Sequence, residues 1–257
     1  VTPALMNFPS KDYIIYEPYG KVLVISPWNY PFQLALLPAM SAFAAGNNVV
    51  LKPSEHTPNT SSLIKKIVEK VFPSELMCVV EGDAKIASQL LEKKWDYIFF
   101  TGSVNIGEIV AVSAAKNLTP YTLELGGKSP AIIDRNTDLK LVSKRIVWGK
   151  FLNSGQTCVA PDYLIVHKSI KGTLIKELID RIELTFDKNF DNTSDITSIV
   201  NEKNFNRLTE LIKENKIIYG GKSDRENRYI FPTIIDNPKM DSNICLLYTS
   251  DAADDVL

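Results

Sequence analysis

From Lys21 to Leu125 the sequence alternates short apolar runs, rich in β-branched residues, with longer stretches of helical character. This alternation is typical of an α/β fold, a parallel β-sheet whose strands are connected by helices. It predicts strands at residues 21–26, 48–52, 77–80, 96–100 and 122–125, and helices at residues 31–45, 57–71, 83–93 and 105–116. Strands as uniformly apolar as these are buried between two helical layers. The helix at 31–45 is apolar nearly all round, so we expect it to be buried as well.

A second alternating set begins after Gly127. It predicts strands at residues 131–133, 163–167, 217–219 and 230–234, helices at 139–152, 170–186 and 202–214, and a polar surface loop at 188–198. The simplest boundary lies near Gly126–Gly127. The sequence therefore predicts a Rossmann-like domain at residues 1–125, followed by a second, incomplete α/β domain at 126–244.

Composition excludes several classes of function. The chain has 257 residues, of which 45% are hydrophobic and 23% charged, as in ordinary soluble proteins. A net charge of −1 without a basic patch argues against nucleic-acid binding. Three dispersed cysteines and two isolated histidines predict neither a disulfide framework nor a metal site, so we expect a reducing, cytoplasmic location. The chain opens at Val1 rather than at a methionine, and we interpret it as a fragment.

One cysteine, Cys158, follows the turn-prone residues 153–157. A turn exposes a thiol where a strand would bury it, whereas most cysteines, such as Cys78 in its apolar run, are inert core residues. No Lys, Arg or His lies within five residues of Cys158. A helix N-terminus or a distant base would therefore have to activate the thiol.

Glu124 is a lone carboxylate between Leu123 and Leu125 at the end of a predicted strand. If the protein desolvates this side chain, its pKa rises and it becomes a suitable general base. The alternative is a salt bridge to Lys128 or to another basic residue at the surface. A glycine pair follows, which allows the backbone to approach a ligand closely. A nucleophilic thiol and a carboxylate base together indicate covalent catalysis.

Polar residues also follow three other strands. Asn29 either caps the next helix or presents its amide at the mouth of the sheet. Lys52 and Glu55 either form a surface pair or bind a ribose, as an acidic residue does in dinucleotide folds. The turn 101–103 opens a helix that contains Gly107, and its N–H groups suit a phosphate, although the segment lacks G-x-G-x-x-G spacing. All of these positions fall at carboxyl ends of strands, where one site would form.

Together these motifs resemble those of the NAD(P)-dependent aldehyde dehydrogenases, most closely the class 3 and fatty aldehyde dehydrogenase branch. The resemblance covers about residues 10–244. The segments that carry it are Pro27–Phe32, Leu51–Glu55, Phe100–Ser103, Leu123–Pro130 and Gly155–Cys158, and Ala160–Tyr163 is similar to that branch in particular.

The resemblance implies oxidation of an aldehyde to a carboxylic acid with hydride transfer to NAD(P). Cys158 would form a thiohemiacetal and then a thioester, Asn29 would stabilise the oxyanion, and Glu124 would activate water. No metal is implied. NAD is favoured because Glu55 would repel a 2′-phosphate, and NADP remains possible. The residues expected to contact the cofactor are Ser26, Trp28, Lys52, Glu55, Thr101, Gly102, Ser103, Gly107, Leu125 and Gly126.

The resemblance further implies a homodimer, a strand at residues 10–17 that takes part in interdomain or oligomer contacts, and membrane association of the parent only through a C-terminal segment that this chain lacks. Residues 245–257 match nothing in the family, and we interpret them as foreign sequence. Two alternatives stay open. One is a CoA-acylating semialdehyde dehydrogenase, against which Glu124 argues. The other is a fragment that binds nucleotide without turnover.

Overall fold

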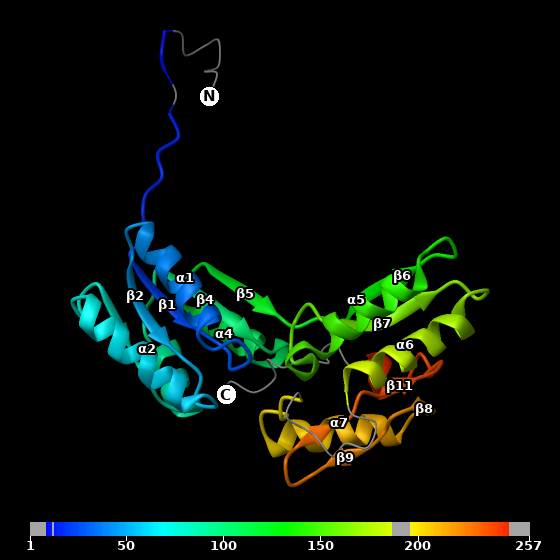
Figure 1. The fold of residues 1–257 in the computed structure, drawn as a ribbon. Coiled ribbons are helices and arrows are strands. Elements are labelled where there is room, and N and C mark those ends of the chain that lie inside the picture. The colour runs from blue at the N-terminus through cyan, green and yellow to red at the C-terminus, as the bar shows by residue number, and fades with distance from the viewer. Residues whose placement is uncertain (1–8, 12, 187–195, 247–257) are drawn as a thin grey trace.

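A five-stranded parallel sheet forms the first unit of the chain (Figure 1). The computed structural model describes residues 9–11, 13–186 and 196–246. The strand order is β3-β2-β1-β4-β5, and the strands are β1 (Lys21–Ile25), β2 (Asn48–Lys52), β3 (Met77–Val79), β4 (Tyr97–Gly102) and β5 (Tyr121–Leu125). The predicted parallel α/β sheet is therefore confirmed, with each strand within two residues of its expected position.

Helices cover both faces of this sheet, as the apolar strands predict. Along β1, Leu23 and Ile25 point to one face and Val22 and Val24 to the other, because successive side chains of a strand alternate. One face packs against α3 (Ala84–Leu91) and α4 (Val104–Lys116), and the opposite face against α1 (Gln33–Ala44) and α2 (Pro58–Val71).

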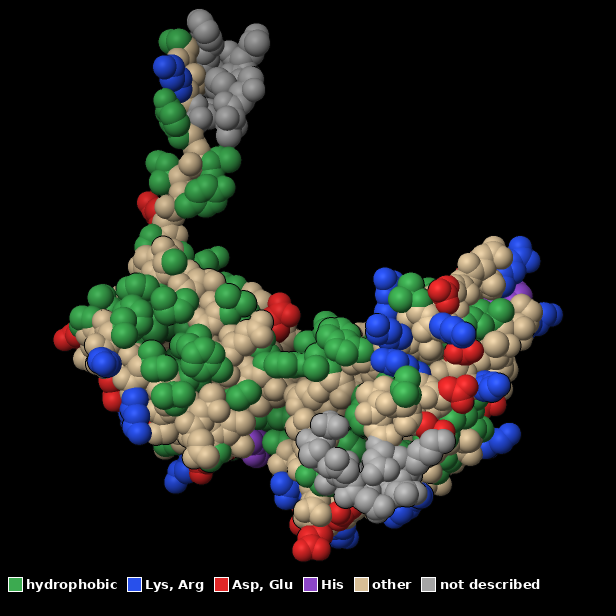
Figure 2. Space-filling model, in the orientation of Figure 1, with side chains coloured by type: hydrophobic (Ala, Val, Ile, Leu, Met, Phe, Trp, Pro, Cys, Tyr) green, Lys and Arg blue, Asp and Glu red, His purple; other side chains and the backbone are tan. Residues whose placement is uncertain are grey.

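The prediction that the first helix is buried is wrong. In α1 only Ala35 and Ala39 are buried, whereas Leu37 is 60% exposed. The helix packs one face on the sheet, and nothing in the described part of the chain covers its other apolar face. Figure 2 shows hydrophobic side chains gathered at the end of the molecule that carries α1 and α2. The exposed members on these helices are Leu37, Met40, Leu63, Ile67 and Val71.

The second unit begins with the parallel pair β6 (Ser129–Ile133) and β7 (Pro161–Val166). Its core contains Val147 of α5 (Leu139–Phe151) together with Leu174 and Ile182 of α6 (Lys171–Thr185). The remaining elements are η2 (Leu152–Gly155), α7 (Glu202–Lys213), β8 (Ile217–Tyr219), β9 (Ser223–Asp224), β10 (Tyr229–Ile230), β11 (Ile234–Ile235) and α8 (Asn243–Leu246).

The predicted strand at 230–234 is two strands instead. β10 pairs with β9, and β11 pairs antiparallel with β8 in a different sheet. Pro232 lies between them and has no N–H to donate to a ladder, so the strand is interrupted there. Most of the predicted loop at 188–198 lies outside the described residues, as does the chain after residue 246.

The described residues among 10–17 extend away from the first unit and are exposed (Figure 1). They form no ladder within this chain. An isolated extended segment becomes a strand only when it has a partner, so the oligomerisation strand expected here stays a prediction.

Candidate active site

The carboxyl ends of β1, β2, β4 and β5 lie along one edge of the sheet. Ile25 pairs with Lys52 on one side and with Phe100 on the other, and Thr101 pairs with Glu124. The strand order reverses beside β1, because β2 follows on one side and β4 on the other. In open α/β sheets such a switch point is where a crevice for ligands forms.

Lys52 ends β2 and is fully buried. Its ammonium group is 2.8 Å from Oε2 of Glu55, whose side chain is 25% exposed. The surface-pair alternative is therefore wrong, because a buried ammonium depends on its partner far more than an exposed one does. The pair sets one cation and one anion at the edge of the sheet.

Ser26 and Trp28 follow β1 and are both buried. Among the described residues, neither Oγ of Ser26 nor Nε1 of Trp28 has a hydrogen-bond partner. Buried polar atoms are nearly always paired, so two such atoms beside the switch point suit a polar ligand. Residues expected to contact a dinucleotide therefore include two with unused hydrogen-bonding capacity.

The turn after β4 opens α4. Ser103 is fully buried and caps the helix by accepting a hydrogen bond from the amide of Ile106 at 3.3 Å. A Cβ at Gly107 would lie 2.8 Å from Leu125, so the glycine lets α4 pack closely on β5. Gly102 pairs with Leu125 in the sheet. Close helix–strand packing through a glycine is a feature of dinucleotide-binding folds.

Cys158 lies in a turn between η2 and β7, as the turn-prone sequence predicts, but it is half-buried rather than exposed. Cys78 is also half-buried, so the core position expected for it is wrong. The segment before it has an unusual backbone, because Asn153, Ser154 and Gly155 all adopt positive φ values of 53°, 54° and 79°. A Cβ at Gly155 would lie 2.9 Å from the carbonyl oxygen of Lys150. Such conformations persist only where the surroundings impose them, and they cluster at functional sites.

Hydrogen bonds tie this turn to the segment after β1. Nδ2 of Asn29 donates to the carbonyl of Gln156 at 3.2 Å, and the Tyr30 hydroxyl lies 2.7 Å from Oγ1 of Thr157. In return, Nδ2 of Asn153 donates to the carbonyl of Asn29 at 3.0 Å. The structure thus brings Asn29 to the turn that carries the thiol. The capping alternative is wrong, since the N-cap position of α1 is Phe32.

Gln156 anchors the turn from the other side. Its side chain is buried, donates to the carbonyl of Ser198 at 3.1 Å and accepts from the amide of Val200 at 3.0 Å. Sequence reasoning missed the positioning roles of Gln156, Tyr30 and Thr157. Their partners are distant in sequence, and the one sequence signal was the polar pair Gln156–Thr157 directly before the cysteine.

Glu124 departs from expectation, because its side chain is exposed. Glu124 lies on the edge strand β5, on the opposite face of the sheet from Leu123 and Leu125, and nothing in the described residues covers it there. The alternative of a salt bridge between Glu124 and Lys128 is wrong, because Lys128 pairs with Asp162 and donates to the carbonyl of Ile244. The intervening Gly127 would place a Cβ 4.0 Å from the carbonyl oxygen of Cys158. The segment that follows the Glu124 strand thus runs beside the cysteine turn.

Lys150, at the end of α5, is a further charged group beside the turn. Burial lowers the pKa of this lysine, while the nearby Asp162 acts to raise it and Lys128 to lower it. No basic residue neighbours Cys158 in sequence, yet the fold places Lys150 against Gly155.

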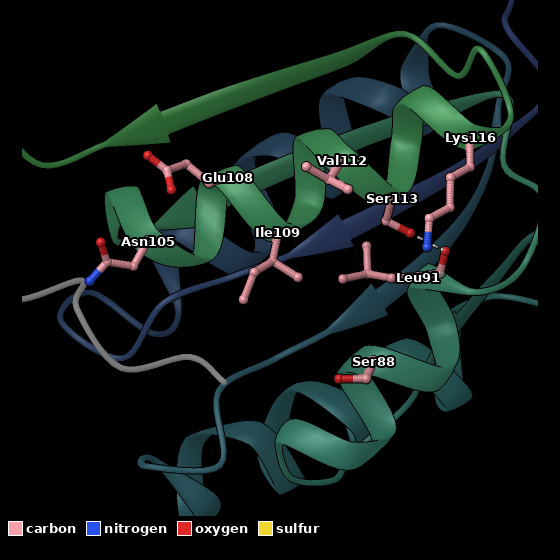
Figure 3. Close-up of a pocket in the computed structure, with 8 residues that line it drawn as sticks. All are labelled: Ser88, Leu91, Asn105, Glu108, Ile109, Val112, Ser113 and Lys116. Atoms are coloured by element: carbon pink, nitrogen blue, oxygen red, sulfur yellow. Dashed lines mark hydrogen bonds between the residues drawn. The ribbon is translucent and has the colours of Figure 1, made fainter.

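A separate hollow lies between α3 and α4 (Figure 3). It contains none of the predicted site residues. On α4 the apolar Ile109 and Val112 lie in the middle of the hollow, between polar side chains at either end. Within the described ranges there is no cluster of His, Cys, Asp or Glu that would hold a metal ion, and no helix is long and apolar enough to cross a membrane.

Comparison with known proteins identifies the family. The model of the aldehyde dehydrogenase family matches residues 5–246. The chain belongs to the aldehyde dehydrogenase family. The match extends two residues beyond the boundary expected at 244. The implied fold and branch are confirmed, because relatives include members of aldehyde dehydrogenase family 3.

Among curated relatives, the chain is 46% identical to the 4,4′-diaponeurosporen-aldehyde dehydrogenase of Staphylococcus aureus, covering 95% of this chain and 54% of that protein. It is 47% identical to aldehyde dehydrogenase family 3 member H1 of Arabidopsis thaliana, covering 94% and 51%. It is 44% identical to the dimeric NADP-preferring aldehyde dehydrogenase of Mus musculus, covering 87% and 49%. The chain thus spans about half the length of these relatives.

Solved structures agree. A substrate-bound aldehyde dehydrogenase of Staphylococcus aureus superposes with a TM-score of 0.90 at 45% identity, covering 96% of this chain and 55% of the other. A Mycobacterium tuberculosis aldehyde dehydrogenase complexed with NAD+ superposes with a TM-score of 0.80 at 28% identity, covering 89% and 50%.

Proposed function

We propose that the protein to which this chain belongs oxidises aldehydes to carboxylic acids and transfers the hydride to NAD(P). The observation that carries the proposal is the hydrogen bonding of Asn29 to the turn of Cys158. A carboxamide donor and a thiol held in one place are the parts that an acyl-transfer site needs. Family membership supports the same reaction.

In the proposed reaction, the Cys158 thiolate adds to the carbonyl carbon, and the aldehyde oxygen becomes an oxyanion. Nδ2 of Asn29 has two N–H groups, one of which donates to Gln156, so the second suits the oxyanion. The backbone N–H of Cys158 is the other proposed donor. Loss of hydride restores the carbonyl as a thioester on the sulfur.

Hydrolysis of the thioester completes the proposed cycle. Glu124 takes a proton from water, the water oxygen adds to the acyl carbon, and the Cys158 sulfur leaves as a thiolate. In this chain Glu124 is exposed. We therefore assign its covering to the portion of the relatives' length that this chain does not span.

The cofactor residues fit the proposal. Bound NAD(P) would accept the hydride. Lys52 and Glu55 suit the adenosine ribose, and the unpaired Ser26 and Trp28 atoms suit further polar groups of the cofactor. The complex of the Mycobacterium tuberculosis relative with NAD+ supports this assignment. Glu55 favours NAD by repelling a 2′-phosphate, and the mouse relative named NADP-preferring supports NADP as an alternative.

Domains and partners belong to the same proposal. Residues 1–125 would form the nucleotide-binding domain and 126–244 the catalytic domain. The partners would be a small-molecule aldehyde and a second copy of the chain, which the mouse relative named dimeric supports.

The experiment compares NADH formation from a medium-chain aldehyde by this chain and by its Cys158→Ala variant. NADH from the wild type and none from the variant is the expected result, and equal rates would overturn the thiol mechanism. Mass spectrometry of Glu124→Gln after mixing with aldehyde and NAD should find an acyl group on Cys158, because hydride transfer does not need the base. Adding CoA separates the acylating alternative, in which CoA releases the acyl group from Glu124→Gln.

A further inference from the structure

Asp162 is the one residue of β7 that has no partner in the ladder with β6. Ser129 pairs with Pro161, and Pro130 pairs with Tyr163, so Asp162 is an extra residue between the two pairs. A bulge of this kind re-aims a side chain, and bulges are frequent next to active sites. Asp162 belongs to the segment Ala160–Tyr163, for which the proposed reaction has no role.

The re-aimed carboxylate forms an ion pair with Lys128, and the exposed fractions of the two side chains are only 10% and 20%. Lys128 follows Gly127, which lies against the carbonyl of Cys158. Asp162 lies four positions after Cys158. The ion pair therefore joins the segment that descends from Glu124 to the far stem of the cysteine turn.

The near stem of the turn contacts the same group of charges. Lys150 lies against Gly155, and the charges of Asp162 and Lys128 both act on the pKa of its ammonium group. Gly149, beside it, would place a Cβ 3.5 Å from Pro161. The end of α5 thus packs on both stems of the turn. Among the described residues, Asp162 pairs with Lys128 and is also the acidic group that raises the pKa of Lys150.

We infer that Asp162 is a positioning residue, which through Lys128 holds the Cys158 turn in register with the strand that carries Glu124. The inference rests on the proposed function, because it specifies how the thiol and its base are aligned. Asp162 touches neither thiol nor substrate in this assignment. It acts through Lys128 and the backbone on either side of the turn.

The test measures the reactivity of Cys158 and the hydrogen exchange of its turn, so it does not depend on catalytic turnover. Alkylation of Cys158 by iodoacetamide is followed by peptide mass spectrometry, with Cys78 as an internal reference, and hydrogen exchange is followed for residues 150–162. Asp162→Asn should change the Cys158 alkylation rate by about threefold or more and speed exchange in that segment, while Cys78 is unchanged. Lys128→Met should do the same, and Lys128→Arg should restore wild-type values.

Lys171 and Asp236 provide the matched control, because they form another half-buried ion pair in the second unit. Lys171→Met and Asp236→Asn should lower the melting temperature without altering the Cys158 rate. The double variant Lys128→Met/Asp162→Asn should show less than the sum of the two single effects, since the Lys128–Asp162 ion pair is lost in each.

The inference is overturned if Cys158 is alkylated at the same rate in Asp162→Asn as in the control variants. It is also overturned if the effects of the two single changes add up in the double variant. If the single variants fail to fold, Lys128→Met/Asp162→Leu, which removes both charges of the ion pair, is compared with the wild type and the controls for the Cys158 rate and for exchange in residues 150–162. A wild type that forms no NADH but shows the expected alkylation changes would count against the proposed function alone.

Discussion

The hydroxyl groups of Tyr30 and Thr157 lie 2.7 Å apart, and their hydrogen bond joins segments that are 127 positions apart in sequence. One belongs to the segment after β1, which also carries Asn29, and the other immediately precedes Cys158. The contact fixes where the amide and the thiol lie relative to each other, so its loss should be felt in both stability and chemistry.

Tyr30→Phe and Thr157→Val should each lower the free energy of unfolding by about 1 kcal/mol, the usual net contribution of such a hydrogen bond. The double variant should cost less than the sum of the two, because the same bond is lost. Urea denaturation measures the energies. Tyr97 and Thr122 share an equivalent hydroxyl pair in the sheet. Tyr97→Phe should cost a similar amount yet leave Cys158 alkylation unchanged, and an equal change at Cys158 would contradict the positioning role of Tyr30.

Gly155→Ala should destabilise the protein by about 1–3 kcal/mol, because the residue has φ +79° and its Cβ would meet the Lys150 carbonyl at 2.9 Å. The change should also alter Cys158 reactivity. Gly172→Ala is the control, since nothing lies within 4 Å of the added carbon and the site is in α6. It should be neutral or slightly stabilising. Denaturation curves that rank the two glycines in the opposite order would refute the strain at Gly155.

Lys150 should make stability depend on alkaline pH. Burial lowers its pKa in the folded state below the ordinary 10.5, so the unfolded chain binds the proton more tightly. Stability should therefore rise, relative to Lys150→Met, as pH increases from the folded-state pKa to 10.5, and the difference should be constant above that value. Chemical denaturation at a series of pH values measures it. In Asp162→Asn the rise should begin at a lower pH, because the carboxylate that raises the lysine pKa is gone.

Cys78 should be the slow thiol. Burial raises its pKa above the ordinary 9.0, so less thiolate is present at any given pH. The midpoint of its alkylation rate should lie above pH 9.0 in the folded chain and shift down in urea. A midpoint that does not move on unfolding would show that desolvation does not control this thiol.

The sequence predicted the elements well and their partners less well. The alternation of apolar and helical stretches located all five strands of the first sheet, because local pattern determines whether a segment forms a strand. The order β3-β2-β1-β4-β5 and the split at Pro232 depend on which strands meet in three dimensions, and no local pattern contains that. The burial expected for α1 failed because burial depends on what covers a helix as well as on its own composition.

Predictions at the site divide in the same way. Cys158 lies in a turn, as its turn-prone neighbours indicated, and Asn29 bonds to that turn from the carboxyl end of β1. The alternative that paired Lys128 with Glu124 was wrong. Lys128 pairs instead with Asp162 on β7, which is distant in sequence. The exposure of Glu124 could not be predicted from its apolar neighbours, because Leu123 and Leu125 pack on the opposite face of the sheet.

The hydrogen bonds between Asn29 and the Cys158 turn cross from the first unit to the second. A molecule that binds both segments therefore changes the free energy that holds the units together, and the coupling is reciprocal by thermodynamic necessity. A ligand that binds only one relative orientation of the units therefore changes the affinity of a second ligand at the turn, and the second changes the affinity of the first by the same factor.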